Sequence, residues 1–211
     1  MAPAFAVWIT GRPGAGKSTL AQALARALRR RGVGVAVLES DALRALLAPG
    51  AGYDEQGRAT FYRALLGLAA LLVHQGVPVL LDATANRRAY RADAATVLPR
   101  FLEVLVDCPQ AVCEARDPKG LYRRARAGEA PWLPGVGVPY EPPEQPDVVV
   151  QGATEDPDEA AGRILAVLSS RGYMPSQCRL CAARRSSAPV GPGPSAWRAS
   201  SPCPRPRMSR R

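Results

Sequence analysis

The sequence contains very little histidine and lysine, and none of its apolar runs is long. His74 is the only histidine, and Lys17 and Lys119 are the only lysines. A single histidine excludes zinc motifs that need two histidines. The most apolar later stretch, residues 64–73, is too short to span a bilayer. We therefore expect no membrane partner.

Cysteine is also scarce. Cys108 and Cys113 lie in apolar surroundings, which is typical of reduced thiols in a reducing compartment, and we predict a cytoplasmic protein. Cys178 and Cys181 form half of a zinc pattern, but no second pair completes it, so incidental cysteines are the favoured interpretation. Residues 1–9 are apolar without a basic leader, and we expect a buried strand there, not a signal peptide.

Acidic residues are absent from 171–211, which hold nine arginines. The remainder has 28 − 9 = 19 basic residues against 18 acidic ones, so the formal net charge of +10 resides almost wholly in this segment. We predict a near-neutral globular domain over 1–170 and a disordered Arg/Pro/Ser-rich tail over 171–211. A near-neutral domain gives no indication of a specific nucleic-acid partner.

The most informative stretch is a glycine-rich motif that follows the apolar residues 5–9 and precedes helix-forming residues. This strand, loop and helix context is typical of a phosphate-binding loop, in which backbone N–H groups surround a polyphosphate. A glycine-rich turn without a ligand is the alternative. We expect Lys17 to be catalytic and Ser18 to bind Mg²⁺. The residues expected to bind ATP are Gly11, Arg12, Pro13, Gly14, Ala15, Gly16, Lys17, Ser18 and Thr19.

Apolar runs alternate with helical patterns along the chain. This order predicts an α/β fold, a doubly wound, mostly parallel five-stranded sheet of the phosphate-loop kinase type. The expected strands are 5–9, 33–38, 77–81, 101–106 and 147–150, and the expected later helices include 56–74 and 156–170.

Two aspartates follow predicted strands: Asp41 comes after 33–38 and Asp82 after 77–81. The carboxyl ends of parallel strands border the ligand crevice of such sheets. We expect Asp82 to hold the Mg²⁺ shell and Asp41 to lie in the ligand crevice. An ordinary helix cap at Asp41 and a plain strand end at Asp82 are the alternatives.

A long polar insertion, about 116–146, separates the last two predicted strands. Structureless loops longer than about 12 to 15 residues are usually lids or disordered. The insertion carries Arg116, Lys119, Arg123 and Arg124, which would bring positive charge to the phosphate cleft. We therefore predict a lid in which Arg116 contacts ATP, with a solvated charged helix as the alternative.

Further motifs resemble the adenylylsulfate kinase family over about residues 5–150. The resemblance implies transfer of the γ-phosphoryl group of MgATP to the 3′-hydroxyl of adenylyl sulfate in sulfate assimilation. It also implies ATP and Mg²⁺ as cofactors, a small-molecule substrate and a homodimer as one option for the oligomeric state. The motifs are Asp41-x-x-Arg44, Gly52-Tyr53 with Arg58, the run 113–122 (CEARDPKGLY) and the run 135–143 (GVGVPYEPP).

The same resemblance implies residue roles on the acceptor side. Asp41 would orient or deprotonate the 3′-hydroxyl, and Arg44 and Arg58 would hold the phosphosulfate. Lys119 would bridge lid and substrate, and Tyr53 would stack on the adenine.

The sequence departs from the family pattern on this side. The Asp-Gly-Asp of the family is Glu39-Ser40-Asp41 here, and its Ser-Pro-Tyr after the third strand is Thr84-Ala85-Asn86. The family has an Asn a few residues after the arginine that Arg58 matches, where this chain has Phe61. The lid Phe that closes on adenine in the family aligns with Leu133, beside Trp132. The acceptor therefore stays open between adenylyl sulfate and another small hydroxylated metabolite, and a nucleotide-binding regulatory protein is the third hypothesis.

Overall fold

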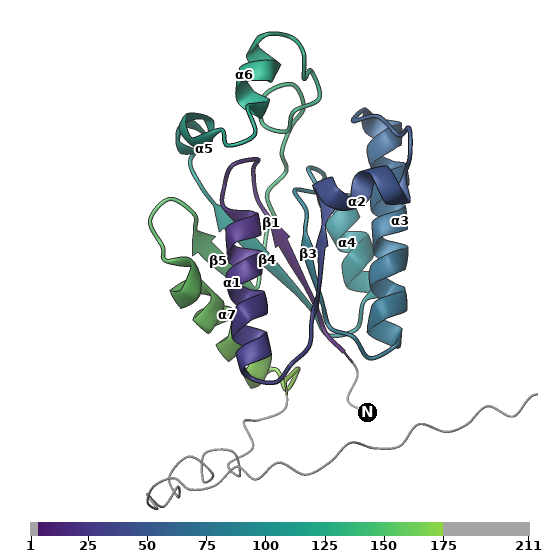
Figure 1. Cartoon of the computed structure of the whole chain (residues 1–211), viewed down its shortest axis with the longest axis vertical. Coiled ribbons are helices and arrows are strands. Elements are labelled where there is room, and N and C mark those ends of the chain that lie inside the picture. Colours follow the sequence, from purple (N-terminus) through teal and green to yellow (C-terminus); the bar gives the residue numbers. More distant parts are fainter. Residues whose placement is uncertain (1–3, 175–211) are drawn as a thin grey trace, which may run out of the picture. The chain divides into compact units, whose positions relative to one another are not determined.

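Strands and helices alternate through residues 4–174, the part of the chain that the computed structural model describes (Figure 1). The elements are β1 (Ala6–Thr10), α1 (Lys17–Arg30), β2 (Ala36–Glu39), α2 (Ser40–Leu47), α3 (Glu55–His74), β3 (Val79–Asp82), α4 (Arg88–Val97), β4 (Phe101–Asp107), α5 (Gln110–Arg116), α6 (Leu121–Arg126), β5 (Val148–Gln151) and α7 (Pro157–Ser170).

The five strands form one parallel sheet in the order β2-β3-β1-β4-β5. Strand β1 lies in the middle, where Val7 pairs with Leu80 of β3 on one side and with Leu102 of β4 on the other. Parallel order requires every connection to cross over a face of the sheet, and the intervening helices make those crossovers. The predicted doubly wound five-stranded sheet is confirmed.

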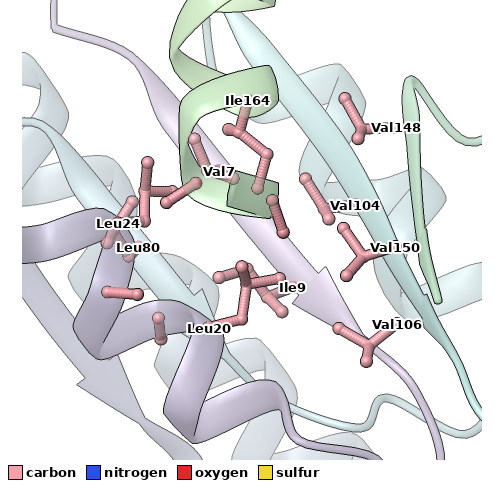
Figure 2. Close-up of a cluster of buried hydrophobic side chains, with 14 of the residues drawn as sticks. Val7, Ile9, Leu20, Leu24, Leu80, Val104, Val106, Val148, Val150 and Ile164 are labelled. Atoms are coloured by element: carbon pink, nitrogen blue, oxygen red, sulfur yellow. The ribbon is translucent and has the colours of Figure 1, made fainter. Parts of the chain in front are cut away.

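Alternate residues of β1 face two separate cores. Val7 and Ile9 pack on the side of α1 and α7, and Trp8 packs on the side of α3 and α4. Figure 2 shows the first of these cores, in which Leu24 of α1 and Ile164 of α7 meet the strand side chains. Burial of β1 on both faces explains its continuous apolar sequence and fixes the position of the loop that follows it.

Strand β2 begins at Ala36, later than the run 33–38 predicts. The reason is the C-terminal cap of α1. Gly32 adopts a left-handed φ of 76°, and its amide donates to the carbonyl of Arg29 while the amide of Val33 donates to Leu28. These two bonds form a Schellman motif, which keeps Val33 out of the sheet.

The packed domain continues past residue 170, where the sequence predicts that it ends. Met174 is 6% exposed within the core on the α1 and α7 side, and Arg171 donates to Asp147 at 2.5 Å. Most of the predicted tail, with Cys178 and Cys181, lies outside the described residues. Within 4–174, no helix combines the length and apolar character needed to cross a membrane.

Candidate active site

The glycine-rich loop joins the end of β1 to the first turn of α1. Gly14 and Gly16 have φ angles of 77° and 104°, which favour glycine. At Gly14 a Cβ atom would also lie 2.9 Å from the carbonyl oxygen of Cys113, so α5 packs directly on the loop. The helix N-terminus and the loop amides make an anion-binding site.

A cavity of about 1090 Å³ lies at the carboxyl ends of the strands, between the loop, α2, α3 and the lid. Ligand pockets usually measure about 300–1,000 Å³, so this one has room for two ligands of nucleotide size. Most of the predicted site residues line it: Pro13, Gly14, Ala15, Gly16, Lys17, Ser18, Thr19, Asp41, Arg44, Tyr53, Arg58, Asp82, Arg116, Lys119, Trp132 and Leu133.

Gly11 and Arg12, for which contact with ATP is expected, do not line the cavity. A Cβ atom at Gly11 would meet the Val106 carbonyl at 2.6 Å, so this glycine permits close packing of β1 against β4. The Arg12 guanidinium lies 5.5 Å from the ring centre of Tyr140, and its carbonyl accepts a 2.9 Å hydrogen bond from Lys17 Nζ. Both residues therefore contact the protein around the loop and not the cavity.

Lys17 and Asp82 form the charged centre of the phosphate-loop side of the cavity, where Ser18 also lies. Burial lowers the pKa of Lys17, while the carboxylate of Asp82 acts in the opposite direction. Asp82 is 4% exposed, and burial raises its pKa against the opposing effects of a hydrogen bond from Ser18 and the charge of Lys17. Asp82 is thus a buried carboxylate beside the phosphate loop, as the sequence predicts.

Asp41 stands on the first turn of α2, on the other side of the cavity. Its Oδ2 accepts a 2.5 Å hydrogen bond from Lys119 Nζ of the lid, and Glu39 Oε1 lies 3.7 Å from the same nitrogen. The bond to Asp41 is the main cause that raises the pKa of Lys119. The lid lysine therefore bridges to β2 and α2 through two carboxylates, of which sequence reasoning assigned a role only to Asp41.

Arg44 is 9% exposed and has no carboxylate partner among residues 4–174. Its guanidinium carbon lies 4.5 Å from the ring centre of Tyr53 and 4.1 Å from that of Phe61. Its one hydrogen bond within those residues goes from Nη1 to the Gly52 carbonyl, at 3.4 Å. Arg44 is thus a buried cation held mainly by two aromatic rings.

Arg58 connects α3 to the lid. Its Nε donates to the Tyr53 carbonyl at 2.7 Å, and its Nη2 donates to the Trp132 carbonyl at 2.6 Å. Burial lowers its pKa, and the neighbouring charge of Arg44 adds to that effect. No carboxylate pairs with Arg58 in the described part of the chain. Trp132 and Tyr53 are about half exposed at the cavity, so both rings are accessible to a ligand.

The lid begins at the C-terminal end of α5 and contains the short helix α6; both helices lie at the top of Figure 1. The Tyr122 hydroxyl of α6 donates to the carbonyl of Pro13 at 3.0 Å, which ties the lid to the phosphate loop. Arg116 donates to the carbonyls of Gly152 and Ala153, so two of its hydrogen bonds go to the backbone of the protein. Of the other lid arginines, Arg124 lines the cavity, whereas Arg123 does not.

The downstream end of the lid, residues 139–141, is held by groups that sequence reasoning missed. Asn86 Nδ2 donates to the Pro139 carbonyl at 3.2 Å, and the Tyr140 hydroxyl lies 3.1 Å from Thr10 Oγ1. Arg91, 2% exposed on α4, donates to the carbonyl of Glu141 at 2.7 Å. Tyr122 and Tyr140 stand in the family-like runs, but nothing in the sequence indicates which backbone or side-chain atoms they contact.

Comparison with known proteins agrees with this geometry. The family profile described as Adenylylsulphate kinase matches residues 3–151. The chain belongs to the adenylylsulfate kinase family. Members of this family are ATP-dependent kinases, phosphotransferases with an alcohol group as acceptor.

Two curated relatives align with this adenylylsulfate kinase family member over nearly their whole length. The adenylyl-sulfate kinase of Synechococcus sp. (strain JA-2-3B'a(2-13)) is 43% identical over 80% of this chain and 96% of its own. The probable adenylyl-sulfate kinase of Pyrococcus abyssi is 38% identical over 81% of this chain and 98% of its own. Among solved structures, the Mycobacterium tuberculosis APS kinase CysC, in complex with AMPPNP and APS, has a TM-score of 0.76 at 36% identity. That match covers 80% of this chain and 99% of the other.

Proposed function

We propose that the protein transfers the γ-phosphoryl group of ATP to the 3′-hydroxyl of adenylyl sulfate, giving 3′-phosphoadenylyl sulfate. The observation that carries this proposal is the pair of buried guanidinium groups of Arg44 and Arg58, which line the cavity and lack carboxylate partners within residues 4–174. Burial of an unpaired charge is costly, so two such cations indicate a ligand that brings negative charge. Adenylyl sulfate brings a phosphosulfate group, whereas a neutral sugar would leave both charges uncompensated.

The phosphate loop supplies the site for ATP. The backbone N–H groups of residues 14–19 at the N-terminus of α1 would surround its phosphates, with Lys17 as the mobile cation nearest the γ-phosphoryl group. Lys17 already lies beside Asp82 in a buried setting, where a polyphosphate would favour its charged form. Phosphoryl transfer depends mainly on in-line positioning and charge stabilisation, and loop amides, Lys17 and lid cations such as Arg116 and Lys119 would provide both.

The residues present suit a bound Mg²⁺ ion. Within 4–174 no cluster of three acidic, histidine or cysteine side chains could hold a metal by itself. Mg²⁺ in kinases is commonly held by one or two protein groups together with substrate phosphates. Ser18 and the buried Asp82, which both line the cavity, would hold it here. When bound, the ion would neutralise charge on the β- and γ-phosphates.

Asp41 is the group that we assign to the acceptor hydroxyl. It lines the cavity, and its Oδ2 accepts a hydrogen bond from Lys119 Nζ. A carboxylate within hydrogen-bond reach of the 3′-hydroxyl would orient it or take its proton. The half-exposed ring of Tyr53 would stack on the adenine, with Trp132 and Leu133 on the lid side. The cytoplasmic location and the homodimer stay predictions.

Initial rates of ADP release test the proposal. The purified chain would be supplied with MgATP and, in turn, adenylyl sulfate, adenosine, gluconate and a panel of neutral sugars. We expect acceptor-dependent turnover with adenylyl sulfate alone, with the new phosphate located on the 3′-oxygen by NMR. Arg44→Gln should raise the KM for adenylyl sulfate without changing the KM for MgATP. Turnover with a neutral sugar at a rate above that with adenylyl sulfate would refute the proposal.

A further inference from the structure

We infer that Phe61 is a positioning residue that fixes Arg44 while leaving its charge available to an anionic acceptor. This inference rests on the proposed function, since it concerns the same anion-binding side of the cavity. Phe61 is fully buried on α3 and does not line the cavity, whereas Arg44 does. The ring therefore lies behind the guanidinium and does not touch the ligand space.

The contact distances support this role. The guanidinium carbon of Arg44 lies 4.1 Å from the ring centre of Phe61, closer than the 4.5 Å that separates it from Tyr53. A cation within about 6 Å of a ring centre is attracted by the electrons of the ring face. The attraction orients Arg44 without a carboxylate and without using any of its N–H donors.

The hydrogen bonds of Arg44 lead to the same conclusion. A guanidinium has five N–H donors. Within residues 4–174, Arg44 uses one of them, in a long 3.4 Å bond to the Gly52 carbonyl. None of its nitrogens is both buried and unsatisfied, so the remaining donors reach the cavity. They are available for the paired bonds that a guanidinium makes with phosphate or sulfate oxygens.

A carboxylate in place of the ring would also fix Arg44, but it would neutralise the charge. An incoming anion would then have to displace that carboxylate, at a cost to affinity. A buried ring avoids this competition because it attracts the cation weakly and occupies only its face. We therefore assign specificity for an anionic acceptor to Phe61 acting through Arg44, in addition to the arginine itself.

The test measures binding of adenylyl sulfate by calorimetry, with the phosphate loop occupied by MgADP, for wild type and three variants. Phe61→Leu removes the ring but keeps apolar bulk. Phe61→Tyr keeps the ring and adds a buried hydroxyl. Leu65→Val, one turn further along α3, is the matched control, because Leu65 is equally buried and has no aromatic ring that could attract Arg44.

We expect Phe61→Leu to weaken binding about ten-fold. Leu65→Val should stay within about two-fold of wild type. Phe61→Tyr should bind like wild type even if its melting temperature falls, which a purely structural role would not produce. In the Arg44→Gln background, Phe61→Leu should have no further effect on binding. If Phe61→Leu does not fold, Phe61→Met provides a second ring-free side chain of similar size.

Equal binding by wild type and Phe61→Leu would overturn the inference. So would a loss of affinity on Phe61→Leu that is as large in the Arg44→Gln background as in the wild-type background. The rate with adenylyl sulfate is measured in parallel, so the two ideas can fail separately. If wild type binds adenylyl sulfate without phosphorylating it, the proposed function fails. The ratio of the dissociation constants of Phe61→Leu and wild type still tests the role of Phe61. If wild type does not bind adenylyl sulfate, the same titration with sodium sulfate gives that ratio.

Discussion

Replacement of Arg91 by methionine should strongly destabilise the domain, although this residue touches no substrate. Arg91 is 2% exposed, and its Nε donates to Glu103 Oε1 of β4 at 2.6 Å. Its other nitrogens donate to the carbonyls of Ala85, Arg87 and Glu141. One buried guanidinium thus connects the central sheet, the loop after β3 and the downstream end of the lid.

The size of the effect follows from what the substitution leaves behind. Loss of one partner of a buried ion pair costs about 3–5 kcal/mol, because the other charge stays buried. The side chain of Glu103 is 19% exposed and can regain some hydration, so we expect the lower end of that range, about 3 kcal/mol. This is a large fraction of a typical domain stability of about 5–15 kcal/mol.

Urea unfolding of Arg91→Met beside Arg87→Met measures the effect. Arg87 pairs with Glu55 on the surface, where the two side chains are 46% and 68% exposed, and such pairs contribute about 0–1 kcal/mol. A loss for Arg91→Met below about 1 kcal/mol, or equal to that of the control, would refute the argument from burial.

Four further outcomes are expected. Lys17→Ala should lower kcat by about 100-fold or more with the melting temperature nearly unchanged, as measured by ADP release and calorimetry. Asp82→Asn should shift the Mg²⁺ dependence of the rate, whereas Asp41→Asn should lower kcat with MgATP binding intact. Because burial raises the pKa of Asp82, its ionised form destabilises the ligand-free protein above that pKa, so Asp82→Asn should raise the melting temperature at neutral pH. This gain should vanish as the pH falls through the raised pKa toward 3.8. Truncation after Ser170 should cost about 2 kcal/mol through loss of the buried Met174, whereas truncation after Met174 should cost almost nothing in urea unfolding.

Sequence reasoning succeeded where one local pattern determines the structure. The apolar run before Gly11 is buried on both faces of the sheet, and Asp82 follows its strand into the cavity as predicted. Helix α4 escaped prediction because its buried residues are Arg91 and Ala94, so it lacks the periodic apolar face by which helices are recognised. The buried Arg91 donates hydrogen bonds to Glu103 and Glu141, which lie 12 and 50 positions further along the sequence.

The lid also shows that a local sequence pattern does not determine which distant residues a segment contacts. The positive charge of the insertion agrees equally well with a lid over the phosphates and with a solvated charged helix. In the structure, α6 is a charged helix, and its buried Tyr122 attaches it to the phosphate loop. Arg116 illustrates why a residue type alone does not determine a role. Its guanidinium is partly committed to the carbonyls of Gly152 and Ala153, contacts that depend on how β5 and the following turn pack.

The cavity holds its cations in two different ways, and the difference follows their proposed roles. Lys119 is paired with Asp41 and Glu39, so the lid can rest against α2 before any acceptor arrives. Arg44 and Arg58 are held by aromatic rings and backbone carbonyls, which fix a guanidinium in place without cancelling its charge. A cation that closes a lid gains from a carboxylate partner, whereas a cation that must bind an anion loses affinity to one. The replacement of a polar family residue by Phe61 therefore preserves the second arrangement, because the ring adds orientation and no competing charge.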